Sequence, residues 1–269
     1  MATYWHPLLA QFLRRDYGDR LIIEEEVNLG NMPLRVDLLL IQRDPAVPLP
    51  YPFSQLGTTT LVSFKGPHDS AGQAALQQLE IYGLLYQQRA KVPRRRDVTL
   101  WLVASKYAQQ VSWREGAYLA RARTVGPGVR AGSLSRFPTC LVNLNELPVD
   151  TATWPLVMVS RGPVEQQLVE YFLDHQAELS KDLPKLIELH WQRFLEVITM
   201  RELTLEELGI EDVDEYIQAI TKIVGSPERV VRALGEEWVM RALVQQLGAE
   251  RVQQMVQQLA QEQSQPPQD

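Results

Sequence analysis

Apolar and polar positions along the first 160 residues predict a mixed α/β fold. Helical spacing and strand-like runs follow one another there, whereas residues 113–136, which contain five arginines, are expected to form a helix or turn. The predicted elements are, in chain order, a helix over 4–15, strands over 21–29, 33–41 and 58–65, a helix over 74–86, and strands over 97–105 and 138–147. A mixed sheet flanked by helices is therefore the expected fold class.

The pattern turns helical in the second part of the chain. Helices are expected over 164–179, 183–202, 213–224 and 227–263, followed by a frayed Gln- and Pro-rich end. We therefore divide the chain into an α/β domain over 1–160 and an all-helical extension over 161–269. An apolar stripe made of Trp238, Val239, Leu243 and Leu247 either joins two copies into a homodimer or packs against the first domain.

Composition narrows the class of protein before any motif is considered. A hydrophobic content of 45% suits a globular core, and no apolar run approaches the length of a membrane span, so no membrane partner is expected. The single Cys140 cannot form an internal disulfide, and no signal peptide opens the chain. These features favour a cytoplasmic protein.

Charge is distributed unevenly between the two parts. Residues 1–160 hold 17 Lys and Arg against 13 Asp and Glu, whereas residues 161–269 hold 10 against 20. The first part is therefore mildly basic, which is compatible with contact to nucleic-acid phosphates, while the tail is strongly acidic.

Two charged residues lie in or at the end of predicted strands and are candidates for a functional site. Asp37 lies in an otherwise apolar strand, where a carboxylate needs a partner or a metal ion, and Lys65 ends the next strand. A carboxylate that holds a divalent cation beside a lysine that positions water is suited to phosphodiester hydrolysis. The structural alternatives are that Asp37 pairs with Arg35 or a loop amide, and that Lys65 is a solvated strand end.

The order of these residues and elements resembles the PD-(D/E)xK nuclease superfamily over roughly residues 5–150, including Rpn-type recombination-promoting nucleases with a helical tail. The resemblance implies a restriction-endonuclease-like fold, Mg²⁺ or Mn²⁺ as cofactor, and DNA or, in some relatives, RNA as substrate. It assigns Asp37 and the backbone of Phe64 to the metal, and Lys65 together with Asp37 to catalysis.

The motif departs from the family at one position. Ser63 stands two residues before Lys65, where the family has a carboxylate, and a hydroxyl is a weaker ligand for a hard cation. Some restriction endonucleases of the superfamily also have Ser-x-Lys and supply the acid from the next helix. Glu80, 15 residues after Lys65, is the candidate substitute as a metal ligand and catalytic residue.

The same helix carries a second resemblance. Gln78 and Tyr82 form a Gln-x-x-x-Tyr pattern like that of RecB-like nucleases, and residues four apart share one helical face, so both are candidate catalytic residues. Glu80 is about 200° from Gln78 around the helix. Glu80 and the Gln78/Tyr82 pair therefore cannot point into one site equally well.

Six arginines are candidates for contact with the nucleic-acid backbone. Three lie between the predicted helix and the apolar strand, and three lie in the Arg-rich segment: Arg94, Arg95, Arg96, Arg121, Arg123 and Arg130. A solubilising role is the alternative.

Two hypotheses follow. The chain is either a Mg²⁺-dependent nuclease acting on DNA, or a catalytically inactive nuclease-fold protein that binds nucleic acid or another protein. The orientation of Glu80 relative to Asp37 separates the two.

Overall fold

The computed structural model describes residues 5–29, 35–66, 69–108, 119–179, 186 and 189–201, and the single residues 244, 250, 251 and 253. The protein divides into two compact units, Met1–Leu168 and Val169–Asp269, each of which is described by itself. Among the described residues, no helix combines the length and the apolar character that a transmembrane segment requires.

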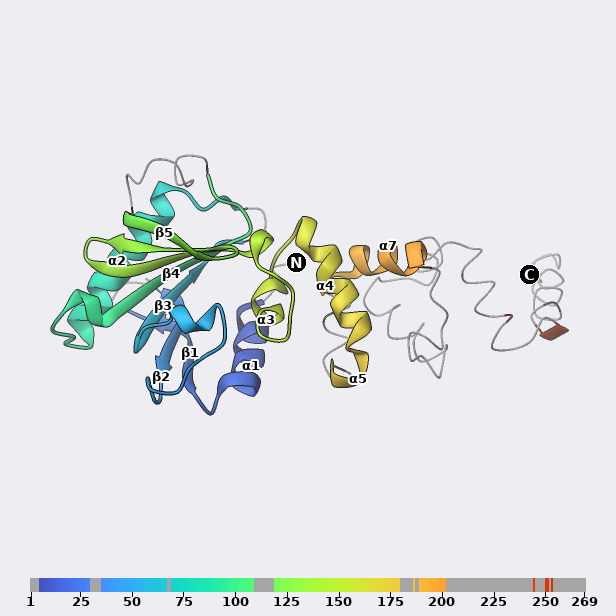
Figure 1. Ribbon diagram of the computed structural model, residues 1–269, viewed down its shortest axis with the longest axis horizontal. Helices are drawn as coiled ribbons and strands as arrows, with labels where there is room; N and C mark the ends of the chain where they lie inside the picture. The colour runs from blue at the N-terminus through green and yellow to red at the C-terminus, as the bar shows by residue number, and fades with distance from the viewer. Residues whose placement is uncertain are drawn as a thin grey trace, which may run out of the picture. The chain divides into compact units, whose positions relative to one another are not determined.

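The first unit is built on one seven-stranded mixed sheet with the order β1-β2-β3-β4-β7-β6-β5 (Figure 1). Strands β3, β4 and β7 run parallel to one another, and the other neighbours are antiparallel. The strands are β1 (Leu21–Asn28), β2 (Arg35–Gln42), β3 (Thr59–Phe64), β4 (Val98–Ala104), β5 (Ala120–Gly126), β6 (Val129–Leu134) and β7 (Phe137–Asn143). The expected mixed sheet flanked by helices is confirmed.

Two helices cover opposite faces of the sheet. Helix α2 (Gln73–Arg89) connects the parallel strands β3 and β4, as a crossover helix must, and packs on a core that includes Leu61 and Leu100. The other face carries Trp101, which stacks on Phe53 at a centroid distance of 6.3 Å; Phe53 in turn lies 4.8 Å from Tyr17 at the end of α1 (Trp5–Tyr17). Successive residues of β4 therefore face different helices, and β4 is buried along its whole length.

Helix α2 approaches the sheet closely at Gly83. A Cβ atom on this residue would lie 3.1 Å from Leu100 Cδ2 and 3.2 Å from Phe137 Cζ, closer than ordinary packing contacts. The absence of a side chain at Gly83 therefore allows α2 to pack closely against β4 and β7. This close packing fixes the positions from which α2 side chains reach the edges of the sheet.

The Arg-rich segment folds differently from the expectation. Residues 120–134 form the antiparallel hairpin of β5 and β6 rather than a helix or turn region. The hairpin turn requires Gly128, whose φ is +67° and whose Cβ would lie 2.7 Å from Asn143 O. Because β5 is an exposed edge strand, its sequence lacks the apolar alternation that marks a half-buried strand.

Short helices complete the described part of the chain. They are the 3₁₀ helices η1 (Phe53–Gln55), η2 (Arg95–Asp97) and η3 (Leu144–Glu146), and the α-helices α3 (Trp154–Val157), α4 (Pro163–Asp174), α5 (Gln176–Leu179) and α7 (Trp191–Arg201). The helices expected over 213–224 and 227–263 lie outside the described residues, apart from the helical positions 244, 250, 251 and 253. The apolar stripe proposed for a homodimer also lies outside them.

Candidate functional site

Asp37 occupies the end of the ladder between β2 and β3. The last paired residues there are Leu38 and Val62, and beyond them Asp37 Oδ2 accepts a hydrogen bond from the Phe64 backbone N–H at 2.6 Å. The carboxylate thus takes the place of a strand carbonyl and satisfies a partly buried amide. This bond resembles the structural alternative in which Asp37 binds a backbone amide.

Ser63 lies next to Asp37 in the sheet. Leu39 pairs with Leu61, and both belong to the core beneath α2. Side chains alternate along a strand, so the same register, continued by two residues, puts Asp37 and Ser63 opposite each other on that face. Ser63 is 4% exposed. The Ser63 hydroxyl is therefore a buried group beside the strand carboxylate.

Lys65, Gln78 and Tyr82 form one chain of hydrogen bonds. Lys65 Nζ donates to Gln78 Oε1 at 3.2 Å, and Gln78 Nε2 donates to the Tyr82 hydroxyl oxygen at 2.5 Å. Gln78 and Tyr82 are four residues apart on α2, so both side chains leave the same side of the helix. The structure therefore brings together three of the residues selected from the sequence, from β3 and α2.

The lysine is held in place, and no neighbour among the described residues neutralises its charge. Its backbone N–H donates to Val103 O at 2.9 Å, which continues the pairing between β3 and β4. The half-buried side chain forms no ion pair with any residue that the structure describes. An ammonium group has three N–H donors, so two remain after the bond to Gln78.

The Tyr82 hydroxyl, at the end of this series of hydrogen bonds, lies in the electric field of Asp37. Burial, and then the negative charge of Asp37, raise the pKa of the Tyr82 hydroxyl, while the hydrogen bond from Gln78 opposes this shift. The hydroxyl therefore stays protonated at neutral pH. Because its oxygen accepts from Gln78, its own proton is directed away from Gln78 and can be donated to another acceptor.

Glu80 leaves the other flank of α2. Each residue advances about 100° around a helix, which puts Glu80 about 160° from Gln78 by the shorter way. Gln78 points to Lys65. Gly83, on the side of α2 away from Gln78, packs against Phe137 of β7. Glu80 is half-buried and forms no hydrogen bond or ion pair with another described residue. Helical geometry thus separates it from the Asp37 side of the helix.

The donor set at this edge does not match what Mg²⁺ requires. The cation takes oxygen ligands, usually one or two carboxylates together with waters and substrate phosphates. In the described part of the chain, no three or more His, Cys, Asp or Glu side chains are grouped to hold a metal. Asp37 supplies one carboxylate, of which Oδ2 already binds Phe64 N, and Ser63 supplies only a hydroxyl. The residues present do not form a metal site on their own.

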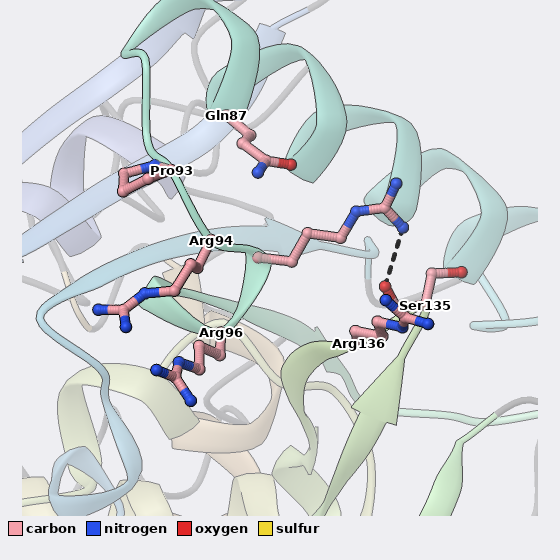
Figure 2. Close-up of a pocket in the computed structure, with 7 residues that line it drawn as sticks. Gln87, Pro93, Arg94, Arg96, Ser135 and Arg136 are labelled. Carbon is pink, nitrogen blue, oxygen red and sulfur yellow. Dashed lines mark hydrogen bonds between the residues drawn. The ribbon is translucent and has the colours of Figure 1, made fainter.

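A second feature, the arginine hollow, lies at the other end of β4. It has a volume of about 860 Å³ and is lined by Gln87, Pro93, Arg94, Arg95, Arg96, Ser135 and Arg136 (Figure 2). Three of these are arginines selected from the sequence. Arg136, from the turn between β6 and β7, was not among them, because only the parallel pairing of β4 and β7 brings that turn beside the segment before β4.

The three remaining arginines lie elsewhere. Arg121 and Arg123 are exposed on β5, the edge strand, and Arg130 lies on β6. Arg121 has a φ of +58° where the register between β5 and β6 shifts, a bulge that interrupts regular pairing. Bulges and charged side chains protect an exposed edge against pairing with other chains, which accounts for two of these arginines without a ligand.

Comparison with known protein families, with curated proteins and with solved structures finds no match to this chain. The candidate site therefore has to be interpreted from its own geometry.

Proposed function

We propose that this chain is a nucleic-acid-binding protein with a restriction-endonuclease-like fold, and that the cluster of Asp37, Ser63, Lys65, Gln78 and Tyr82 contacts a phosphodiester group of DNA. The order of helix, three strands, helix and strand supports the fold assignment, as does an aspartate in the second strand with a lysine after the third. Fold alone does not fix function, so the proposal depends on the site.

Lys65 carries the proposal. Its ammonium group is held by Gln78 at the end of a parallel strand and has no carboxylate partner among the described residues. A partly buried cation in this state gains most from an anionic ligand. Tyr82, with its raised pKa, keeps a hydroxyl proton that can be donated to a phosphate oxygen. Two donors of this kind, linked to each other through Gln78, suit a phosphodiester better than a neutral ligand.

Ser63 favours binding over cleavage. It leaves the cluster with a single carboxylate, and Glu80 lies on the opposite flank of α2. A protein that had kept the metal-dependent reaction would be expected to keep a second carboxylate near Asp37.

Metal-dependent cleavage of DNA, with Mg²⁺ or Mn²⁺, is the second candidate function. One observation favours it: Gln78 holds Lys65 in one orientation on the same face as Asp37. Fixing a lysine side chain costs conformational entropy, and a lysine that only attracts phosphate by its charge would not need to be fixed.

Variants of Asp37 and Lys65 distinguish the two candidates. DNA binding is measured by fluorescence anisotropy without divalent cations, and plasmid cleavage is measured with Mg²⁺ or Mn²⁺, for the native protein, Lys65→Gln and Asp37→Asn. Arg20→Gln, just before β1 and with a side chain 41% exposed, is the charge-matched control for Lys65→Gln.

If the site only binds, Lys65→Gln weakens binding more than the control does, Asp37→Asn strengthens it by removing a repulsive charge, and no protein cuts DNA. If the second candidate is right, the native protein cuts and both variants abolish cleavage. A native protein that neither binds nor cuts DNA refutes both.

A further inference from the structure

The arginine hollow concentrates positive charge at one point of the first unit. Four of its seven lining residues are arginines, and none of the seven is acidic. The lining comes from three places in the chain: the end of α2 at Gln87, the segment Pro93–Arg96, and the turn at Ser135 and Arg136. Arg94 is paired with Asp97, and the other three cations repel one another unless an anion lies between them.

Arg95 is fixed before any ligand arrives. Its Nη1 donates to Ser135 O at 3.0 Å, the bond dashed in Figure 2, and its guanidinium carbon lies 5.5 Å from the centre of the Phe137 ring, a cation–π distance. Both contacts join the segment before β4 to the turn between β6 and β7. Arg95 therefore holds the two sides of the hollow together and keeps its own charge in place.

Arg96 and Arg136 supply charge that can be used for binding. Both are exposed, and neither forms a hydrogen bond or an ion pair with a described residue. Figure 2 shows Arg94 and Arg96 extending to one side of the hollow and Arg136 lying beside Ser135. Ser135 and Arg136 have φ values of +47° and +75°, a turn conformation that favours Gly or Asn. An arginine there is unfavourable for the turn itself, which points to another use of the side chain.

The hollow is separate from the cluster at Lys65. Gln78 and Gln87 are nine residues apart on α2, so they leave the helix on opposite flanks and about 14 Å apart along its axis. The hollow also lies before the first residue of β4, whereas Lys65 lies beside its far end. A ligand bound in the hollow is therefore distinct from the phosphodiester group at Lys65.

We infer that the arginine hollow is a second phosphate-binding site that grips the backbone of the same nucleic acid away from Lys65. Guanidinium groups match phosphate oxygens with paired hydrogen bonds, and several of them around an open hollow match a chain with repeating charges better than a single small anion. The identity of the ligand as nucleic acid rests on the proposed function. The existence of the site rests on the arginines alone.

The test compares the binding of a labelled 20-nucleotide single-stranded DNA at several salt concentrations. The double variant Arg96→Gln/Arg136→Gln is expected to bind about tenfold more weakly than the native protein. Its plot of log K against log salt should be shallower by about 1.4, because each phosphate contact to a single strand contributes about 0.7. Arg20→Gln removes one positive charge elsewhere, so twice its effect is the control for the two charges lost in the double variant. Circular dichroism checks folding.

A second variant moves the affinity in the opposite direction. Asp97 Oδ2 pairs with Arg94 Nε at 3.2 Å at the margin of the hollow. Asp97→Asn releases Arg94 and should strengthen binding and steepen the salt dependence. Asp19→Asn, which adds the same charge at an exposed pair with Arg20, should have a smaller effect.

The outcomes separate this inference from the proposed function. If the native protein binds DNA, Lys65→Gln weakens binding and the double variant weakens it by no more than twice the effect of Arg20→Gln, the hollow is not a phosphate site and the inference is wrong. If the double variant weakens binding and Lys65→Gln does not, the hollow is a phosphate site and the proposed role of Lys65 is wrong. If the protein does not bind DNA, tripolyphosphate is titrated by calorimetry. Binding of this ion without binding of DNA overturns the assignment of the hollow to a nucleic-acid strand.

Discussion

Ser63→Asp should turn the cluster at Lys65 into a metal-binding site. The register of β2 and β3 puts residue 63 opposite Asp37 on the face beneath α2, where side chains on paired strands are about 5 Å apart. An aspartate at this position would supply the second carboxylate that the cluster lacks. Ser63→Asn, which has the same size and no charge, is the matched control.

The magnitude follows from the separation and the burial. Two carboxylates about 5 Å apart repel by about 3 kcal/mol at an effective dielectric constant of about 20. Ser63 is 4% exposed, so water screens this repulsion little. Without divalent cations, Ser63→Asp should therefore lower the free energy of unfolding by about 3 kcal/mol more than Ser63→Asn. For a unit of this size the difference corresponds to a melting temperature lower by roughly 6–12 °C.

Mg²⁺ should reverse the loss. A cation at about one hundred times its dissociation constant stabilises the folded protein by about 2.7 kcal/mol, which is close to the repulsion it removes. Thermal melting of both variants with EDTA and with increasing Mg²⁺ measures the effect, and plasmid cleavage is recorded in the same buffers. If Ser63→Asp and Ser63→Asn respond to Mg²⁺ alike, residue 63 does not face Asp37 in a latent metal site, and the argument from the strand register is refuted.

Three further predictions concern stability and reactivity. Gln78→Leu removes both bonds of the hydrogen-bond chain and should cost about 2 kcal/mol in urea unfolding, whereas Tyr82→Phe removes one and should cost about 1; the reverse order would contradict the chain. Burial raises the pKa of the Cys140 thiol from 9.0 to about 12, so its contribution to stability is complete below pH 9 and is lost as the pH rises toward 12. Rapid reaction of the native thiol with Ellman's reagent at pH 8 would disprove this burial. Gly83→Val should destabilise the fold by about 1–3 kcal/mol, because its Cβ lies 3.1 Å from a leucine of β4, whereas Ala74→Val at an exposed position of the same helix should cost less; equal losses would mean that α2 is not closely packed there.

Local sequence patterns determined most of the α/β framework. Strand-like apolar runs marked β1 to β4 and β7, and helical spacing marked the first two helices, because each of these elements buries apolar side chains. The hairpin of β5 and β6 was missed for the converse reason. An exposed edge strand buries little, so its sequence carries no such signal.

Sequence spacing alone also linked Gln78 to Tyr82, since residues four apart on a helix share a flank whatever the fold around them. It could not say which flank of α2 faces Lys65. That was decided by the packing of Gly83 against β4 and β7, which turns Gln78 toward Lys65 and leaves Glu80 on the other side.

The arginine hollow depended on tertiary structure entirely. Arg96 and Arg136 are 40 residues apart in the chain, and neither carries a local pattern that predicts the other. They line one hollow because β7 pairs in parallel with β4 and the turn before β7 therefore lies beside the segment before β4. The spacing of residues within one element determines which of its side chains lie on the same face. The order of the strands in the sheet determines which distant segments meet, and no single segment of the sequence encodes that order.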